Sequence, residues 1–518
     1  MGRPKSFPRS HPPAGLAPLL AAAAALLLYA VTAAPSLTWA HHGADGGDLI
    51  AAAMTGGVPH PSGYPTYCLL GRLFALLPLG PAARRFALFS ATAAAAAVGV
   101  LCLCAQRLLE DDAGRRSWRS AAIAAAAALL AATGPILWSQ AVIAEVYALN
   151  ALFFALGLHL ALHAPARPGV AFAAGLALGL GLGNHLTLAL ALPGLAVLAW
   201  RGAPRRPGRL AASLAVGLVL GLAVYAYLPL AARRDPPVNW GDPRTWERFV
   251  AVVTGRVYRP YLLGVPLASL PARLGAWAGL WARQLTWPGV ALALAGAAAG
   301  IDDGAGRGHR RRLLGTALLV AAYSAYAITY DTADSYVYLI PAYLVAALWV
   351  ARGAAAVAVW TEDLFASRRQ WAVAVVFAVL ALLPALSAVR HAPAISLRYD
   401  REATAWLADV TQRLPPGALL ITLQDRHTFA LAYARWVEGR RDDVIVVDAD
   451  LLAYPWYHAQ LRRRHPSLVL PGDRLTAPGL AGANLPLRPV FLASTRDDVM
   501  AQLSAVPDGP IWRVTDSR

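Results

Sequence analysis

Apolar residues in the first 390 positions gather in long, nearly uncharged runs rather than alternating with polar ones. A helix needs about 20 mostly apolar residues to cross the roughly 30 Å hydrocarbon core of a bilayer. Several runs approach that length, so the pattern predicts an α-helical polytopic membrane protein of about eleven transmembrane helices. The candidate spans are residues 15–34, 86–106, 120–137, 150–163, 170–183, 186–200, 210–232, 285–301, 313–330, 336–350 and 371–389.

The pattern changes after residue 389. Short apolar runs at 417–423, 444–447 and 489–493 predict buried strands. Residues 402–414 before them and 429–437 between the first two predict helices. Strands that alternate with helices are typical of an α/β domain. We therefore divide the chain into a transmembrane domain at 14–389 and a small α/β domain at 390–518. The second domain contains neither G-x-G-x-x-G nor a P-loop, so no nucleotide site is indicated.

Composition agrees with a membrane protein. The chain is 58% hydrophobic and only 14% charged, whereas soluble proteins carry about 25% charged residues. A soluble enzyme and a disulfide scaffold are therefore poor descriptions of the whole. Cys68, Cys102 and Cys104 lie in or beside apolar runs and have no zinc or redox spacing.

The net charge of +17 is explained by where the arginines lie. With residues 1–13 in the cytoplasm, the outer segments 138–149, 184–185 and 331–335 contain no lysine or arginine. This is the positive-inside pattern, and it excludes a nucleic-acid partner in favour of the lipid bilayer. It predicts the cytoplasmic (inner) membrane, long outer loops at 35–85 and 233–284, and an extracytoplasmic C-terminal domain. Fusing the spans at 170–183 and 186–200 into one would put Arg201, Arg205, Arg206 and Arg209 outside and break the pattern. The inner-loop arginines are Arg107, Arg115, Arg116, Arg119, Arg167, Arg201, Arg205, Arg206, Arg209, Arg307, Arg310, Arg311, Arg312, Arg352, Arg368 and Arg369.

Two carboxylates mark the first outer loop. Asp45 and Asp48 are three residues apart, so both can face one side if a helix begins near Asp48. Such a pair suits a general base with a second acid that positions it. The alternative is an N-cap with a solvated acid of the first turn. Asp45, Asp48 and Asp331 are also ligands that Mg²⁺ or Mn²⁺ accepts, but carboxylate count alone does not establish a metal site.

Other polar residues are predicted to join this pair on the outer side. Ionisable groups near membrane depth usually face an internal site. The candidates for donor or acceptor binding are His60, Tyr64, Gln140, Glu145, Tyr147, Asn184, His185, Asn239, Trp240, Asp331, Asp334 and Tyr336. Arginines can hold a lipid phosphate through paired hydrogen bonds, and Arg233, Arg256 and Arg259 are the candidates. Snorkelling of these arginines toward head groups is the alternative.

The first outer loop also carries an extended motif. It reads D-x-G-[DE]-L-I, then G-V-x-H-P-x-G-Y-P-x-Y, then L-L-G-R-L-F, over residues 45–74. This run resembles the domain-of-unknown-function 2723 family, which is similar to GT-C glycosyltransferases and includes transmembrane protein 260, a protein O-mannosyltransferase of animals. Later segments that match the family lie at 138–149, 184–185, 236–243 and 331–341, so the resemblance covers residues 14–345.

The resemblance implies a membrane enzyme that takes a sugar from a polyprenyl-phosphate sugar. The acceptor is a protein hydroxyl or an envelope glycan outside the membrane, and Asp45 matches the GT-C aspartate that acts as base. Asp48 stands where most members have glutamate, Gly46 where serine is frequent, and Ser62 where a second proline often follows His60. The change at Asp48 shortens the side chain but keeps the carboxylate.

Two other classes of function fit the same spans. One is a polytopic transporter or a flippase of lipid-linked sugars, without transferase chemistry. Transporters often contain inverted repeats and binding sites at the membrane midplane, whereas this chain has no evident repeat and its polar residues gather on one side. The other is a membrane scaffold that carries a periplasmic binding domain. Release of polyprenyl phosphate separates the enzyme from both.

Overall fold

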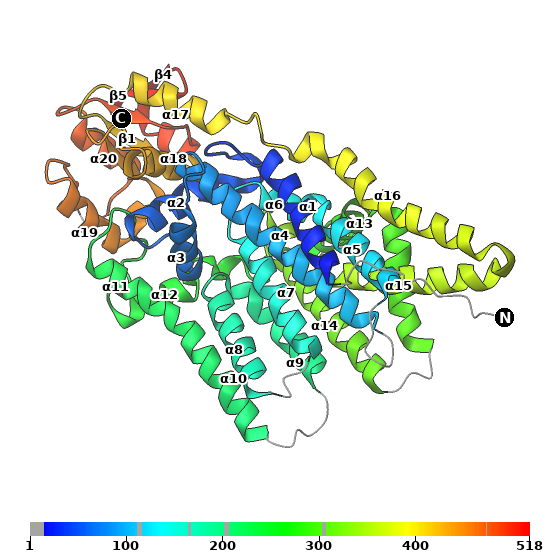
Figure 1. Ribbon diagram of the computed structural model, residues 1–518. Coiled ribbons are helices and arrows are strands. Elements are labelled where there is room, and N and C mark those ends of the chain that lie inside the picture. The colour runs from blue at the N-terminus through cyan, green and yellow to red at the C-terminus, as the bar shows by residue number, and fades with distance from the viewer. Residues whose placement is uncertain are drawn as a thin grey trace, which may run out of the picture.

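The computed structural model describes residues 15–110, 117–163, 167–200, 207–302, 307–472 and 474–517. Figure 1 shows a bundle of long helices with a smaller sheet domain at one end. The predicted cytoplasmic N-terminus at 1–13 lies outside the described residues, as do the inner-loop arginines Arg115, Arg116, Arg201, Arg205 and Arg206.

Each of the eleven apolar runs coincides with helix in the part of the chain that is described. The break at Asn184 and His185 is real, because one helix ends at Leu182 and the next begins at Leu186. The bundle consists of α1 (Leu16–Thr32), α4 (Ala82–Leu108), α5 (Trp118–Ala132), α6 (Pro135–Ala141), α7 (Tyr147–His163), α8 (Pro168–Leu182), η2 (Leu186–Ala191), α9 (Leu192–Ala199), α10 (Pro207–Leu222), η3 (Ala223–Ala226), α11 (Tyr227–Arg233), α13 (Leu270–Asp302), α14 (Arg307–Thr329), α15 (Ile340–Leu364), η7 (Ala366–Arg368) and α16 (Arg369–Ile395).

The helices differ in length. Among the described residues, five helical segments are long and apolar enough to cross a membrane, and the α5–α6 pair, bent by 70°, makes a sixth if it is one span. Four further apolar helices are shorter, at 10–17 residues. The fold is that of a multi-pass membrane protein, and the count of eleven crossings stays a prediction.

Glycines bring α8 and α10 into backbone contact. A Cβ on Gly175 would lie 2.1 Å from the Leu214 carbonyl oxygen, and one on Gly217 would lie 2.1 Å from that of Phe172. Gly179 and Gly221 meet one turn further along. Small residues four apart allow this approach in membranes, where packing rather than hydrophobicity holds helices together. The three cysteines are buried, as predicted, and none of them forms a disulfide.

The segments between the spans fold into short helices at the end of the bundle nearest the sheet domain (Figure 1). The first loop and the second loop are joined by backbone hydrogen bonds, Val58 N to Val238 O at 2.9 Å and Trp240 N to Val58 O at 3.0 Å. The short helices are η1 (Ala40–Asp45), α2 (Gly46–Thr55), α3 (Pro65–Phe74), α12 (Trp246–Val253), η4 (Arg256–Tyr261), η5 (Leu267–Ser269) and η6 (Ser335–Leu339).

The C-terminal region is the predicted α/β unit, with a five-stranded sheet of order β2-β1-β3-β5-β4. β1 pairs in parallel with β2 and β3, and β5 runs antiparallel to β3 and β4. The β4–β5 hairpin was not predicted from the sequence, because its residues are largely exposed and lack an apolar run. The elements are α17 (Glu402–Arg413), β1 (Leu419–Thr422), α18 (Asp425–Trp436), β2 (Ile445–Asp448), η8 (Asp450–Ala453), α19 (Pro455–Arg464), α20 (Ala477–Asn484), β3 (Val490–Leu492), α21 (Asp497–Met500), β4 (Leu503–Asp508) and β5 (Ile511–Ser517).

The sheet domain is docked on the loops at 35–85 and 233–284. Its helix α18 packs on α2 so closely that a Cβ on Gly47 would lie 2.3 Å from the carbonyl oxygen of Phe429. Trp39 Nε1 donates to the Arg426 carbonyl at 3.2 Å, and Gln460 Nε2 donates to the Asn239 carbonyl at 2.7 Å. Any site formed by these loops is therefore bordered on one side by the C-terminal domain.

Candidate active site

Asp48 and His60 form a buried ion pair at the start of α2. Asp48 is 1% exposed, and its Oδ2 accepts hydrogen bonds from the His60 backbone N–H and from His60 Nδ1, each at 2.8 Å. Its other oxygen accepts a hydrogen bond from Trp240 Nε1 at 3.0 Å. The carboxylate of Asp48 thus has a donor on each oxygen and holds the imidazole in one orientation.

Asp45 lies on the opposite edge of the same imidazole. Its Oδ2 is 3.4 Å from His60 Nε2, and its side chain is 40% exposed. Asp45 is the N-cap residue of α2, but its carboxylate makes no capping hydrogen bond. The N-cap and the solvated acid considered from the sequence are therefore not the roles that the geometry assigns. Asp48, His60 and Asp45 thus form an array in which the Asp45 side chain is accessible and the Asp48 side chain is buried.

The charges of the array depend on one another. Burial alone would lower the pKa of His60, but the carboxylates of Asp45 and Asp48 outweigh it and raise that pKa to about 9. Desolvation raises the pKa of Asp45, and the cationic His60 opposes this rise. An imidazolium therefore stands between the two carboxylates at neutral pH.

Aromatic side chains surround this array. Tyr64 packs edge-on against His60 with ring centroids 5.0 Å apart, and it stacks on His185 at 6.1 Å. Tyr147 lies 5.4 Å from His185, so both predicted residues line the same recess. Tyr338, which the sequence analysis did not select, contacts the rings of Tyr147 and His185, each at 5.8 Å.

Glu145 and the two predicted amide residues, Gln140 and Asn184, are buried. Glu145 is 3% exposed, and its Oε2 accepts a hydrogen bond from Val146 N at 3.1 Å. Asn184 Nδ2 donates to the Val146 carbonyl at 3.1 Å, and Gln140 Nε2 donates to the His41 carbonyl at 3.2 Å. These amides hold the loops that present Glu145 and η1, and their own carbonyl oxygens accept no hydrogen bond within the described residues.

The acidic loop before η6 divides between two places. Asp334 is near enough to Asp45 to influence its charge, and Tyr336 packs on His42 at 5.9 Å. Asp331 instead pairs with Arg273 at 3.2 Å. The sequence analysis did not select Arg273. Because Asp331 pairs with this arginine, Asp331 is not part of the group formed by Asp45, His60 and Asp48.

The second outer loop contributes both buried and exposed groups. Trp240 reaches Asp48, as described above, and Asn239 Nδ2 donates to Asp242 Oδ1 at 3.0 Å. The arginines predicted to hold a lipid phosphate, Arg233, Arg256 and Arg259, are all exposed. Arg256 lies 3.7 Å from Glu247.

Tyr258 lies between Arg256 and Arg259 on η4. It is half-buried, and desolvation raises its pKa, with Asp45 and Asp48 among the charges that act on it. Tyr258 is thus less exposed than the two arginines on either side of it, and its ring lies 6.5 Å from that of Tyr261. Tyr258 adds to the site a residue that spacing did not indicate.

The C-terminal domain supplies two further residues. Phe429 on α18 stacks on the His60 ring at 5.9 Å with an interplanar angle of 15°. Desolvation raises the pKa of Asp425 to about 6, and the charge of Asp45 adds to this. The site is therefore built from both halves of the chain, although the sequence analysis placed it wholly in the outer loops.

Metal ligation has no preformed geometry here. Among the described residues, no group of three or more His, Cys, Asp or Glu side chains is gathered as a metal site would require. Asp331, one of the three carboxylates considered for Mg²⁺ or Mn²⁺, pairs with Arg273. Metal dependence therefore stays a question for experiment.

Comparisons with known proteins identify related sequences. Residues 45–206 match the family model of the protein O-mannosyl-transferase TMEM260 N-terminal domain, and residues 403–469 match TMEM260-associated domain 2. Protein O-mannosyl-transferase TMEM260 of Mus musculus is 25% identical over 471 residues, which cover 83% of this chain. The chain spans 63% of the length of that relative.

Comparisons with solved structures identify the fold. ArnT from Cupriavidus metallidurans bound to undecaprenyl phosphate superimposes with a TM-score of 0.57 at 14% identity, over 96% of this chain and 97% of that one. The apo state of the same protein gives 0.56 at 15% identity, over the same shares. The matches to two TMEM260 domains and to ArnT thus confirm the predicted family resemblance, on a GT-C-like membrane fold.

Proposed function

We propose that this protein is a glycosyltransferase that uses a polyprenyl-phosphate sugar. It transfers the sugar to an acceptor hydroxyl of a protein or an envelope glycan, on the outer side of the cytoplasmic membrane. Its mouse relative is named as a protein O-mannosyl-transferase, and the similar ArnT structure holds undecaprenyl phosphate. The observation that carries the proposal is the 3.4 Å contact between His60 and Asp45, the accessible carboxylate.

Asp45 acts as the general base. It takes the proton of the acceptor hydroxyl while that oxygen attacks the anomeric carbon of the donor sugar. The bond between the anomeric carbon and the phosphate oxygen breaks, and polyprenyl phosphate leaves as an anion that needs no strong acid. A base must be reachable by the acceptor, and Asp45 keeps 40% of its side-chain surface open.

Asp48 and His60 act as positioning residues. Both oxygens of Asp48 already accept hydrogen bonds, from His60 and from Trp240, so Asp48 has no free oxygen pointing at an acceptor. Desolvation raises the pKa of Asp45, and cationic His60 opposes that rise and fixes the direction of the Asp45 carboxylate. The exposed Arg256 and Arg259 flank Tyr258 and would stabilise the departing phosphate.

The orientation of the protein follows from the same proposal. We place the loops at 35–85 and 233–284 and the domain at 390–518 outside the membrane, with residues 1–13 in the cytoplasm. The docking of α18 on α2 requires the domain and the first loop to share a side. The positive-inside distribution of arginine supports the direction.

The test is release of polyprenyl phosphate by purified protein from radiolabelled polyprenyl-phosphate mannose, glucose, galactose and arabinose. We expect release with one of these donors, and a loss of about 10²–10⁴-fold in Asp45→Asn. Asp409→Asn is the matched control, because Asp409 lies on α17 and pairs with Arg413. Full transfer by Asp45→Asn would refute the base assignment. No release from any donor by wild-type protein would favour a transporter or flippase.

A further inference from the structure

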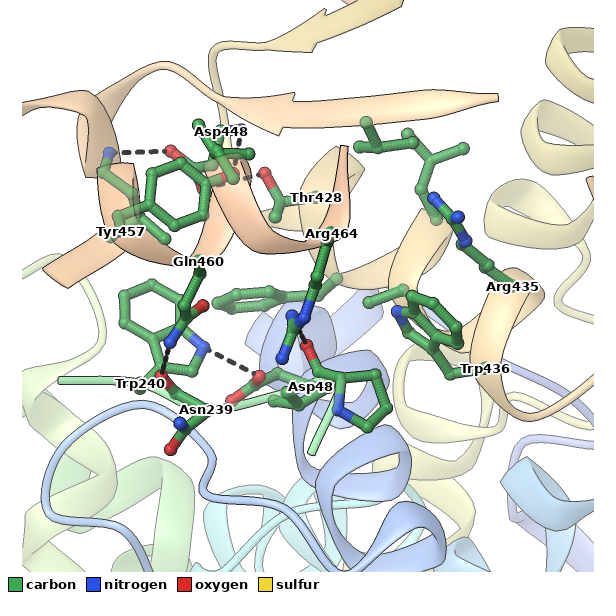
Figure 2. Close-up of a pocket in the computed structure, with 18 of the residues that line it drawn as sticks. Asp48, Asn239, Trp240, Thr428, Arg435, Trp436, Asp448, Tyr457, Gln460 and Arg464 are labelled. Carbon is green, nitrogen blue, oxygen red and sulfur yellow. Dashed lines mark hydrogen bonds between the residues drawn. The ribbon is translucent and has the colours of Figure 1, made fainter. Parts of the chain in front are cut away.

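A cavity of about 120 Å³ lies between the second outer loop and the C-terminal domain. Its walls come from residues 237–240 on one side and from α18, β2 and α19 on the other. Figure 2 shows Asp48 and Trp240 at the base of this space, with Gln460 and Arg464 extending toward them from the C-terminal domain. A buried water needs about 10–15 Å³ by such a measure, so the cavity has roughly ten atom-sized positions, enough for one pyranose ring.

The walls combine flat apolar faces with fixed polar groups. Trp240, Phe429 and Trp436 line the cavity, and an aromatic face is the surface on which the C–H face of a pyranose packs. Small-molecule sites typically have this composition, in which a few placed polar groups orient the ligand. The aromatic side chains come from both domains, so the cavity exists only when they are docked.

Gln460 presents an unpartnered oxygen to this space. The residue is 4% exposed, and its Nε2 donates to the Asn239 carbonyl at 2.7 Å, which sets the direction of the amide. No described residue donates a hydrogen bond to its Oε1, which Figure 2 shows turned toward the middle of the cavity. This oxygen is open to the cavity, so it can accept a hydrogen bond from a ligand hydroxyl.

The charges of the wall favour a neutral ligand. Two carboxylates, Asp48 and Asp448, and two guanidinium groups, Arg435 and Arg464, line it, and both arginines donate to backbone carbonyls. Asp448 already accepts hydrogen bonds from Asp450 N at 2.9 Å, Leu451 N at 3.2 Å and Thr428 Oγ1 at 3.0 Å. Neither an anion nor a cation would therefore find an unbalanced partner, whereas hydroxyl groups both donate and accept.

The edge of the sheet argues against an extended peptide. β2 is an edge strand and lies beside the cavity, so a peptide could in principle add to it as a further strand. However, Tyr457 Oη accepts from Asp448 N at 3.0 Å, and Arg435 Nη1 donates to the Val444 carbonyl at 2.8 Å. These side chains occupy backbone groups that an added strand would need.

We propose that this cavity binds one neutral pyranose residue of a glycan acceptor, and the acceptor role rests on the proposed transferase function. Gln460 Oε1 accepts a hydrogen bond from a sugar hydroxyl, and the Tyr457 hydroxyl lies in the same wall to donate to another. The Arg464 guanidinium is held in that wall by the Pro236 and Pro237 carbonyls. Asp48 forms part of that wall and contacts His60, which contacts Asp45. The bound pyranose is thereby linked to the proposed base through Asp48 and His60, and a neighbouring residue of the glycan carries the hydroxyl that Asp45 deprotonates.

The test measures binding without turnover. Saturation-transfer NMR on full-length protein in nanodiscs would use methyl α-D-mannopyranoside, methyl β-D-glucopyranoside and a serine- and threonine-containing peptide as probes. Ala432→Phe fills the cavity from α18, where Ala432 is half-buried. Ala408→Phe on the exposed face of α17 is the matched control. We expect a pyranoside signal that Ala432→Phe and Trp436→Ala abolish and that Ala408→Phe retains.

Two outcomes would overturn the proposal. One is a pyranoside signal that Ala432→Phe leaves unchanged, or no pyranoside signal in wild-type protein. The other is binding of the peptide alone, which would assign the cavity to a protein acceptor. Loss of the proposed transferase function would show separately, as absence of polyprenyl phosphate release by a wild-type protein that still gives the pyranoside signal.

Discussion

A single oxygen of Asp48 accepts hydrogen bonds from both the backbone N–H and the ring Nδ1 of His60, each at 2.8 Å. This geometry fixes the main chain and the side chain of His60 together. The second ring nitrogen then has one direction available, and it lies 3.4 Å from Asp45. The position of the proposed base therefore depends on a carboxylate whose two oxygens are already occupied by hydrogen bonds.

We predict that Asp48→Asn lowers both stability and turnover. The amide offers one acceptor oxygen in place of two, and it removes the buried counter-charge of His60. Breaking a buried ion pair costs about 3–5 kcal/mol, so the free energy of unfolding should fall by about that amount. Thermal unfolding in detergent and the release of polyprenyl phosphate measure the two effects.

The variant Asp48→Glu tests whether the carboxylate at this position orients the base or only fills space. Glutamate keeps the negative charge and both acceptor oxygens, so the longer carboxylate should restore much of the turnover that Asp48→Asn loses. A variant Asp48→Asn with unchanged turnover would show that Asp48 does not position the base.

We predict that His60 makes the protein less stable as the pH rises toward 9. The folded-state pKa of His60 is about 9, above the value of about 6.5 for an unfolded histidine. Its contribution is therefore complete below about pH 6.5 and is lost as the pH rises through 9. The shift corresponds to about 3 kcal/mol, and unfolding of wild type and His60→Gln from pH 6 to 9.5 should converge at high pH. Parallel curves would contradict a charged His60.

We predict that Gly47→Ala loosens the C-terminal domain. The added Cβ would lie 2.3 Å from the Phe429 carbonyl oxygen, and backbone atoms on both sides cannot move without separating α2 from α18. Limited proteolysis at 396–401, together with thermal unfolding, reports the separation. Gly275→Ala is the control, because nothing lies within 4 Å of its added Cβ. Equal protease resistance in both variants would argue against this docking.

We predict that Gly217→Ala destabilises the α8–α10 pair by about 1–3 kcal/mol. Its Cβ would lie 2.1 Å from the Phe172 carbonyl oxygen, whereas a Cβ on Gly208 of the same helix meets nothing within 4 Å. Thermal unfolding of Gly217→Ala and Gly208→Ala in nanodiscs compares the two. A lower melting temperature is expected for Gly217→Ala alone, and equal melting temperatures would disprove the contact.

Part of the site was predictable from local spacing. Asp45 and Asp48 are three residues apart, and that interval brings both to the first turn of α2, beside His60 twelve residues later. Asp331 was predicted for the same cluster, but Arg273 pairs with it. Nothing in the spacing of these two residues, 58 positions apart, signals their pairing.

The amino-acid sequence alone determined the apolar helices, the polar loops between them and the change to an α/β domain after residue 389. Those features follow from local periodicity and from the cost of placing charge in a bilayer. Only the tertiary structure decided that Phe429 stacks on His60 and that Asp45, rather than Asp48, is accessible. The reason is physical: burial and ring contacts depend on which distant segments pack together, and the α2–α18 docking joins residues nearly 400 positions apart.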